Sequence, residues 1–232
     1  MSDRKFEILE TKERVIADND VAAIEVRHML KDKGVFMVNL MSSPGAGKTT
    51  TLLRTIAALK DKYRIGVMEA DVDSDVDAAA VSATGTRVIQ LHTGGSCHMD
   101  ADMTKRGLEG MDIDDLDLIF LENVGNLVCP AEFDVGANLK VMILSVPEGD
   151  DKPLKYPLMF KVSDCLLINK IDTEPAFDFN FAVLRSRVLD LNPDMNIIRM
   201  SSLTGDGFDE WTEYLVRMIE RQIRNGGNNE DH

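Results

Sequence analysis

The feature that most constrains the fold is the regular alternation of short apolar segments with helical patterns. Seven short apolar segments are predicted strands, at residues 35–41, 64–70, 87–92, 117–123, 139–146, 164–169 and 195–200. Most are apolar on both faces, which is typical of parallel strands covered by helices on both sides. Apolar residues at helical spacing predict helices at 21–33, 47–62, 181–191 and 207–224. The sequence therefore predicts an α/β fold with a doubly wound, mostly parallel β-sheet.

The domain organisation follows from length and from the two ends. The 232 residues fit one domain, with a short N-terminal helical extension and a flexible polar C-terminal tail over 225–232. The first predicted helix follows Asp18, Asn19 and Asp20, and any of these could cap it. No apolar run approaches the roughly 18 residues of a membrane span, and the first residues lack the apolar core of a signal peptide. We expect a cytoplasmic protein that has no membrane partner.

Charge and cysteine content exclude further classes of protein. Forty acidic residues against 26 basic ones give a net charge of −14, which repels nucleic acid at long range. We therefore expect no nucleic-acid partner. Three cysteines, Cys97, Cys129 and Cys165, do not indicate a disulfide framework, because they are few and their number is odd. Buried thiols, metal binding and redox chemistry remain as roles for them.

A phosphate-binding loop follows the first predicted strand. Its sequence is Ser42-Ser43-Pro44-Gly45-Ala46-Gly47-Lys48-Thr49-Thr50. This matches G-x-x-x-x-G-K-[ST] except that serine replaces the first glycine, and the simpler alternative is a glycine-containing turn. The two glycines let backbone N–H groups point at phosphate oxygens, and the helix that follows adds its dipole. Lys48 is expected to reach the β- and γ-phosphates and Thr49 to bind Mg²⁺, as in P-loop NTPases.

A second motif predicts which base is bound. The strand at 164–169 runs into Asn169-Lys170-Ile171-Asp172, an N-K-x-D sequence. The Asp172 carboxylate can accept from both N1–H and the 2-amino group of guanine, whereas adenine offers neither donor. Asn169 is expected to brace neighbouring loops and the Lys170 stem to lie over the base. The loop Ser201-Ser202-Leu203 would close the pocket. A polar strand-to-loop turn is the alternative, but beside the phosphate loop the motif favours GTP over ATP.

Acidic residues at two further strand ends are candidates for magnesium binding. Glu122 and Gly125 form Glu-Asn-Val-Gly, where many GTPases have Asp-x-x-Gly. In those proteins the acid holds Mg²⁺ through water and the glycine N–H senses the γ-phosphate. Asp71 is the second Mg²⁺ candidate. The nearby acids Asp73, Asp75 and Asp77 fit a solvated helix start better. We predict Lys48, Thr49, Glu122 and Gly125 as the catalytic set.

Two thiols and an imidazole are predicted at the same edge of the sheet. Cys97 and His98 follow the strand at 87–92, and Cys129 follows Gly125. Such ligands suit Zn²⁺ and Ni²⁺. Three ligands leave a tetrahedral site one short, so a water or a symmetry mate must complete it. The alternative is that these are small buried hydrophobes, which is the reading we favour for Cys165 in its apolar strand.

Three segments give the chain a family resemblance. They are 93–100 (TGGSCHMD), 122–131 (ENVGNLVCPA) and 148–157 (EGDDKPLKYP). The chain resembles the nickel-incorporation GTPase of hydrogenase maturation over about residues 20–220. The resemblance implies a metal-binding GTPase that dimerises with nucleotide. It also implies that this GTPase helps a partner nickel chaperone deliver nickel to the precursor of the [NiFe]-hydrogenase large subunit. The family's shared metal site falls on Cys97, His98 and Cys129.

The chain also departs from some members of that family. Residues 1–34 contain no cysteine and only His28, so neither tight N-terminal nickel binding nor nickel storage is expected. Asn126 follows Gly125 where a water-positioning Gln would stand, and we see no arginine finger, so turnover should be slow. The expected mechanism is a GTP-gated metal handoff by a homodimer that nucleotide and metal promote. Alternatives are an accessory GTPase for urease, a P-loop ATPase or kinase with a structural zinc, and a non-enzymatic scaffold.

Overall fold

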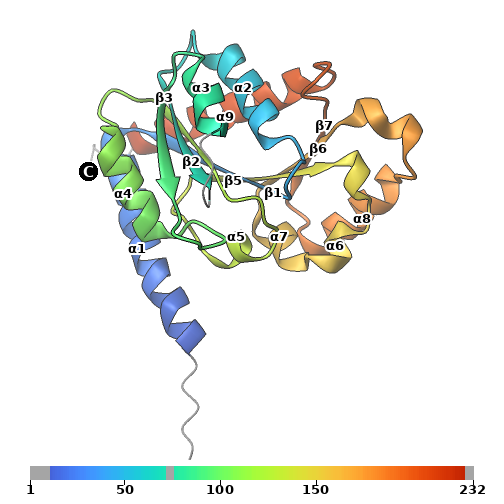
Figure 1. Cartoon of the computed structure of the whole chain (residues 1–232), viewed down its shortest axis with the longest axis horizontal. Helices are drawn as coiled ribbons and strands as arrows, with labels where there is room; N and C mark the ends of the chain where they lie inside the picture. The colour runs from blue at the N-terminus through green and yellow to red at the C-terminus, as the bar shows by residue number, and fades with distance from the viewer. Residues whose placement is uncertain (1–10, 72–75, 228–232) are drawn as a thin grey trace, which may run out of the picture.

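The centre of the structure is a seven-stranded sheet in which every paired strand is parallel (Figure 1). The computed structural model describes residues 11–71 and 76–227. The strands are β1 (Phe36–Ser42), β2 (Ile65–Asp71), β3 (Arg87–His92), β4 (Leu118–Glu122), β5 (Leu139–Ser145), β6 (Cys165–Asn169) and β7 (Asn196–Arg199), in the order β3-β2-β4-β1-β5-β6-β7. Each lies within one or two residues of its predicted position, so the predicted parallel sheet is confirmed.

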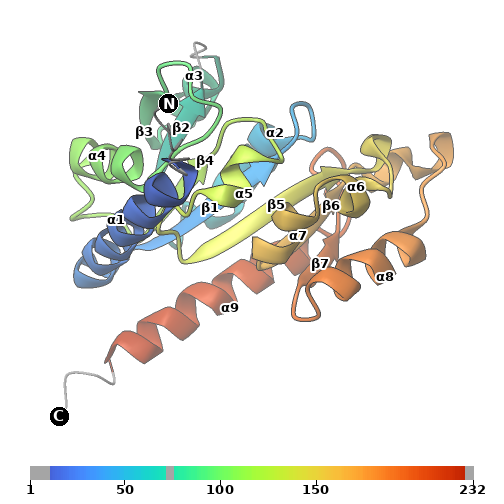
Figure 2. The ribbon, with the colours of Figure 1, turned by 90° about the horizontal axis from the view of Figure 1, so that it is seen from below.

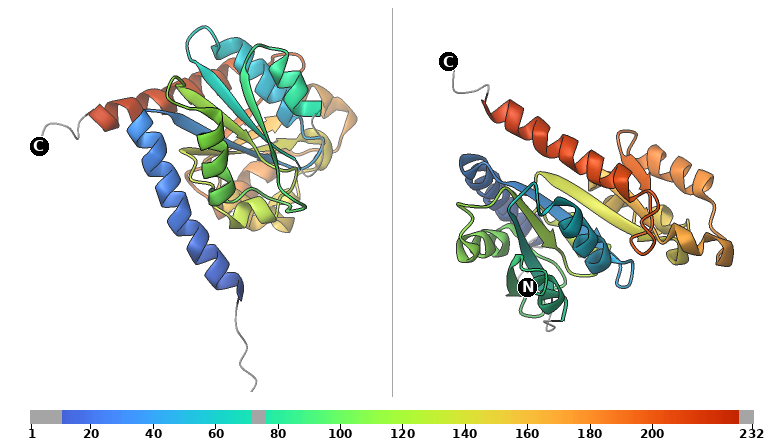
Figure 3. Two further views of the ribbon diagram at one scale, coloured as in Figure 1. Left: turned by 60° about the vertical axis from the view of Figure 1, so that its left-hand side comes forward. Right: turned by 90° about the horizontal axis from the view of Figure 1, so that it is seen from above.

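Helices cover both faces of this sheet (Figures 1 and 3). One face packs against α2 (Lys48–Leu59), α3 (Val76–Ser82) and α9 (Phe208–Gly227). The other face packs against α1 (Thr11–Lys33), α4 (Ala101–Met111), α5 (Cys129–Glu132), α7 (Pro157–Val162) and α8 (Phe181–Leu191). The short α6 (Lys152–Lys155) precedes α7, and 3-10 turns occupy Val146–Glu148 and Ile171–Ala176. The doubly wound prediction is confirmed.

Burial explains why the central strands lack an alternating pattern. Every residue of β1, β4 and β6 is buried, because helices cover both of their faces. The edge strand β3 is instead partly exposed along its length. Within the described residues, no helix combines the length and the apolar character needed to cross a membrane.

The first helix differs from its prediction. It already begins at Thr11, so Asp18, Asn19 and Asp20 lie inside it and the predicted cap was wrong. Asn19 is buried and has tertiary partners instead: its Oδ1 accepts from the Ala101 N–H at 2.9 Å, and its Nδ2 donates to the Asp134 carbonyl at 2.9 Å. A polar residue that resembles a cap thus joins α1 to two later segments. Figure 2 shows α1 lying alongside α4.

Two other predicted boundaries also changed. Helix α2 ends at Leu59, short of the predicted 62, and α9 continues to Gly227 into the predicted tail. The remainder of that tail, 228–232, lies outside the described residues, as do Asp73 and Asp75. Helix α4 was not predicted because Gly107 and Gly110 interrupt its pattern. At Gly107 a Cβ atom would lie only 2.7 Å from the Met68 sulfur and 2.8 Å from Leu91, so glycine lets α4 pack closely on the sheet.

Candidate functional site

The parallel sheet brings the predicted site segments to one edge. The phosphate loop follows β1, Asp71 ends β2, Cys97 follows β3, Glu122 ends β4, Asn169 ends β6 and Ser201 follows β7. Since all seven strands run the same way, their carboxyl ends meet at the same edge, where ligands of open α/β sheets bind. Asp71 stands in register with His92, but its side chain, like that of Asp77, is outside the description.

The phosphate loop has the backbone that phosphate binding requires. Gly45 and Gly47 have positive φ angles of 76° and 98°, which L side chains rarely adopt. Among the described non-glycine residues only Asp112 and Lys170 share that property, so Ser42 does not need the freedom of the glycine it replaces. Its hydroxyl donates to the Ser43 carbonyl at 2.7 Å and accepts from Lys48 Nζ at 3.2 Å. Serine is therefore compatible with the loop.

A cavity of about 500 Å³ opens over this loop. Its lining comes from the phosphate loop and from the ends of β4 and β6: Pro44, Gly45, Gly47, Lys48, Thr49, Thr50, Glu122, Gly125 and Lys170. Gly125 lies against the loop, since a Cβ atom there would sit 3.1 Å from Pro44 Cγ. Most of the residues predicted for the phosphates and the switch thus surround one space.

Oxygen ligands suited to Mg²⁺ meet at the base of this cavity. The Thr49 hydroxyl donates to Glu122 Oε1 at 2.9 Å, and Glu122 is only 4% exposed. A hydroxyl and a carboxylate are the hard oxygen donors that Mg²⁺ prefers, and it usually binds through one or two carboxylates plus substrate phosphates. The pair fits the ion.

Asn169 lies between the two halves of the candidate nucleotide site. Its side chain is buried, donates to the Ala46 carbonyl at 2.9 Å and accepts from the Ser202 N–H at 2.9 Å. The same residue restricts the phosphate loop, because a Cβ atom at Gly47 would lie 2.5 Å from Asn169 Nδ2. One amide therefore ties the phosphate loop to the loop after β7.

The remaining residues of the predicted base pocket lie around Asn169. Lys170 has φ 61° and donates from Nζ to the Gly45 carbonyl at 2.6 Å. Asp172 is exposed, and its Oδ1 accepts from the Ser201 hydroxyl at 2.5 Å. Leu203 is 76% exposed at the rim. The carboxylate predicted to read guanine is thus accessible and oriented by a neighbour in the loop predicted to close the pocket.

Two residues of this region were missed by sequence reasoning. Thr51 places its hydroxyl 2.7 Å from that of Ser202, and Arg54 donates from Nη1 to the carbonyls of Ser202 and Leu203 at 3.0 and 3.1 Å. Both lie on α2, so the phosphate-loop helix also holds the loop after β7. No sequence motif marks them, because a polar residue on a helix face has many ordinary explanations.

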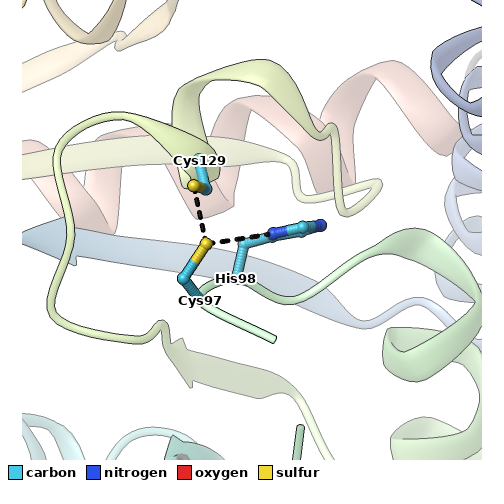
Figure 4. Close-up of side chains that lie close together, drawn as sticks. All are labelled: Cys97, His98 and Cys129. Carbon is cyan, nitrogen blue, oxygen red and sulfur yellow. Dashed lines mark hydrogen bonds between the residues drawn. The ribbon is translucent and has the colours of Figure 1, made fainter. Parts of the chain in front are cut away.

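The predicted metal ligands come together (Figure 4). Cys97 Sγ lies 2.7 Å from Cys129 Sγ and 3.9 Å from His98 Nδ1, and one ligand atom from each residue falls within 4.8 Å of the others. Cys97 and His98 come from the loop after β3, and Cys129 begins α5. The His98 ring stacks on Phe133 at 3.9 Å between centroids. Two thiols and an imidazole are a donor set for Zn²⁺ or Ni²⁺.

The protonation of this cluster follows from its surroundings. The hydrogen bond with the Cys129 thiol, and then burial, raise the pKa of Cys97, so the thiol is protonated at neutral pH without metal. Burial lowers the pKa of His98, so its imidazole is neutral, which is the form that binds metals. Cys165 is fully buried in β6, and burial raises the pKa of its thiol. It lies on a strand, away from the cluster, as its apolar context predicted.

Comparison with known proteins gives the family. Residues 36–199 match the CobW/HypB/UreG nucleotide-binding domain family. The chain belongs to this family. It is 43% identical to the hydrogenase maturation factor HypB of Rhizobium leguminosarum bv. viciae, over 94% of this chain and 73% of that protein. Its fold is therefore that of a nucleotide-binding domain, and its relatives place it in the HypB branch.

Solved structures agree with this assignment to HypB. The chain superposes on HypB from Helicobacter pylori, crystallised in complex with nickel, with a TM-score of 0.84 and 34% identity, covering 89% of this chain and 97% of that one. It superposes on HypB from Archaeoglobus fulgidus with a TM-score of 0.82 and 37% identity, covering 88% and 99%. The resemblance seen in the sequence is confirmed at the level of family and fold.

Proposed function

We propose that this HypB-family chain is a GTP-hydrolysing metallochaperone that helps to insert nickel into [NiFe]-hydrogenase. One observation carries the proposal: a single short segment, 122–129, begins at the carboxylate beside the phosphate loop and ends at a thiol of the metal cluster. The relatives support it, since they are hydrogenase maturation factors and one was crystallised with nickel. A change of nucleotide state that moves Gly125 can then also move Cys129, because both belong to this segment.

At the nucleotide end, we assign roles to the residues that line the cavity. Lys48 would neutralise the β- and γ-phosphates, and backbone N–H groups of the loop from Gly45 to Thr50 would bind their oxygens. Thr49 and Glu122 would hold Mg²⁺, with Asp71 as a further candidate, and the bound ion would neutralise charge that develops on the phosphates. Gly125 would bind the γ-phosphate and register its loss. Asn126 follows it in place of a water-positioning Gln, and its amide is bonded to the Cys97 carbonyl and the Val128 N–H, so intrinsic turnover is slow.

At the base end, Asp172 would bind guanine, and the loop Ser201-Ser202-Leu203 would close over it. Asn169, Thr51 and Arg54 hold that loop in place through the hydrogen bonds described above. Lys170 would cover the base with its stem. This arrangement favours GTP and GDP over adenine nucleotides, because adenine has neither the N1–H nor the 2-amino group from which the carboxylate would accept.

At the metal end, nickel is the cargo. Cys97, His98 and Cys129 supply three donors at a partly exposed position, which suits an ion that must leave again. A second copy of the chain, related by a two-fold axis, can complete the coordination because its loops are the same. The proposed partners are therefore a homodimer mate, a nickel chaperone and the precursor of the hydrogenase large subunit.

The deciding experiment follows mass and metal binding in each nucleotide state. Light scattering of the full chain with no ligand, with GDP and with a non-hydrolysable GTP analogue, each with and without Ni²⁺ or Zn²⁺, should show most dimer with the GTP analogue and metal. A monomer under all these conditions would reject the dimer switch. GTP turnover that falls by about 10²-fold or more in Lys48→Ala separates the enzyme from a scaffold. Equal displacement of bound GTP by ATP and by GTP would favour the ATPase or kinase alternative.

A further inference from the structure

Asn123 is a buried amide located where the nucleotide and metal halves of the molecule meet. It lies between Glu122 and Gly125 in sequence and is 1% exposed. Its backbone N–H donates to the Leu40 carbonyl at 3.0 Å, which extends the pairing of β1 with β4 by one bond. The strand therefore fixes where the Asn123 side chain begins, and only its amide group is left to interact with the loops.

The Asn123 carbonyl oxygen serves both loops at once. Oδ1 accepts from the Val124 N–H at 2.9 Å and from the Met99 N–H at 3.2 Å. Val124 immediately precedes Gly125, and Met99 immediately follows His98. Met99 is fully buried, so water cannot replace Asn123 Oδ1 as the acceptor for its N–H. One oxygen atom thus holds the backbone beside the phosphate-sensing glycine and the backbone beside a metal ligand.

The other end of the amide is anchored on the central strand. Asn123 Nδ2 donates to Asn39 Oδ1 at 3.2 Å, and Asn39 is 2% exposed in the middle of β1. The strand β1 runs directly into the phosphate loop. Asn39 is a polar residue between apolar neighbours in β1, and this bond accounts for it. The Asn123 amide therefore bonds to three segments of the chain: the loop after β3, the loop after β4 and β1 itself.

We infer that Asn123 is the positioning residue that couples nucleotide state to metal affinity. The inference rests on the proposed function, since it concerns the same two sites. A movement of the segment from Glu122 to Gly125 shifts the Val124 N–H, and the shared oxygen must then move relative to the Met99 N–H. The loop that carries Cys97 and His98 is displaced or released accordingly. The covalent path to Cys129 acts on one ligand, and Asn123 acts on the other two.

A second, weaker link runs parallel to this one. Asn126 Nδ2 donates to the Cys97 carbonyl at 3.3 Å, and its Oδ1 accepts from the Val128 N–H at 2.8 Å. These bonds lie near the surface, where water can replace them, so their loss costs less than loss of a buried bond. The two asparagines therefore predict a graded result, with the buried residue carrying more of the coupling.

The test measures Ni²⁺ affinity of the full chain by titration in the presence of GDP and of a non-hydrolysable GTP analogue. The ratio of the two dissociation constants is the coupling factor, which for allosteric proteins is about 5- to 150-fold. Asn123→Ala should bring this factor to within about twofold of unity, while Asn126→Ala reduces it less. By reciprocity, Ni²⁺ should change nucleotide affinity by the same factor in each protein.

A matched control lies at the opposite end of β1. Asn138 Oδ1 accepts from the Met37 N–H at 2.7 Å, also a bond from a backbone amide to an asparagine, but far from both sites. Asn138→Ala should keep the full coupling factor. If Asn123→Ala does not fold, Asn39→Ala decides: it removes the anchor, leaves both acceptor bonds, and should lower the factor partly. Wild-type coupling in that variant would overturn the inference.

The outcomes separate the inference from the proposed function. A wild-type protein without coupling rejects the GTP-gated handoff itself, and the inference with it. Coupling in the wild type that survives unchanged in Asn123→Ala rejects only the role of Asn123. Equal loss of coupling in Asn123→Ala and Asn138→Ala means that the effect is general destabilisation, which also rejects it.

Discussion

The nucleotide edge, which comprises the phosphate loop and the loops after β6 and β7, differs from the metal cluster of Cys97, His98 and Cys129 in how the rest of the chain supports it. At the nucleotide edge, side chains from distant elements bond to the backbone of each loop: Asn169 to Ala46 and Ser202, Lys170 to Gly45. At the metal cluster the two thiols contact each other, His98 contacts Cys97 and the neighbouring Ser96 hydroxyl, and Cys97 is exposed. Support from the rest of the chain comes through the Phe133 ring and through backbone bonds to two asparagines.

The difference teaches which site can set the state of the other. A preorganised loop loses little freedom when its ligand binds, so most of the binding energy of nucleotide is available for other changes. A lightly supported cluster can change geometry at small cost. Nucleotide binding is therefore expected to govern the metal site in practice, although the coupling free energy is the same in both directions.

The largest effect is expected from Lys48→Ala, which removes the charge at the nucleotide edge. GTP turnover should fall by about 10²–10³-fold, the range seen when one positioned stabilising group is lost. Metal affinity without nucleotide should stay unchanged, since the cluster does not contact Lys48. The measurements are phosphate release and Ni²⁺ titration, with circular dichroism to verify the fold. Wild-type turnover in this variant would show that the cavity over the phosphate loop is not the site.

Asp172→Asn should alter which base is bound at the nucleotide edge. Replacing a carboxylate by an amide removes an acceptor for guanine, so GDP affinity should drop by about 10²-fold while affinity for xanthosine diphosphate rises, because its 2-oxo group can accept from the new amide. Competition binding with both nucleotides measures the switch. Asp194→Asn, the same change at an exposed carboxylate just before β7 and thus at the opposite edge of the sheet, is the control and should change neither affinity much. Loss of both nucleotides to the same extent would contradict the predicted role of the carboxylate.

Cys129→Ala should affect the metal cluster alone. Ni²⁺ affinity should weaken by more than about tenfold, since even changes behind the ligands of metal sites cost 10–100-fold. GDP affinity should remain within about twofold. Cys165→Ala is the matched control, because that thiol is fully buried in β6. If the two variants bind Ni²⁺ equally well, the cluster is not where the metal binds.

The smallest effect concerns Asp134, which connects α1 to the segment after α5. Burial alone would raise the pKa of Asp134, but the Gly136 N–H and the cations of Lys140 and Arg27 hold that pKa below its ordinary value. Its stabilising effect is therefore present above the unfolded pKa of about 4 and is lost as pH falls through the lower folded value. Asp134→Asn should lower the free energy of unfolding by about 1–2 kcal/mol at pH 7.

Urea unfolding at several pH values checks this prediction. The difference between Asp134→Asn and the wild type should shrink below about pH 4 as the carboxylate becomes protonated. Lys33→Gln, which removes an exposed ion pair with Asp114, is the control and should change stability by less than about 1 kcal/mol. A difference that is constant from pH 3 to pH 7 would mean that the charge of Asp134 is not what stabilises the contact.

The sheet and the motifs were predictable because their signals are local. Buried parallel strands are apolar on both faces, and the phosphate loop has a fixed spacing of glycines and lysine. Helix α4 was not predicted, because Gly107, which lets the helix approach Met68, also interrupts the helical pattern. The cap predicted at Asn19 was wrong, because a short amide side chain can form either a helix cap or a tertiary contact. In both cases the deciding partner is distant in sequence.

The candidate site shows the same limit. The sequence indicated that Cys97, His98 and Cys129 lie at one edge, since that follows from parallel topology, and the structure places them within reach of one ion. The sequence did not indicate Thr51, Arg54 or the double acceptor role of Asn123. Those depend on register and on side-chain direction, which only the packed sheet defines.

The strand order has a consequence for how the chain is made. β1 pairs with β4 on one side and with β5 on the other, so its first neighbour is complete only at residue 122 and its second only at residue 145. Pairings of such long range form slowly, and their apolar strands stay open to aggregation in the meantime. The phosphate loop follows β1, whereas the residues predicted to bind guanine follow β6 and β7, so the nucleotide pocket cannot be complete before residue 203 has been synthesised.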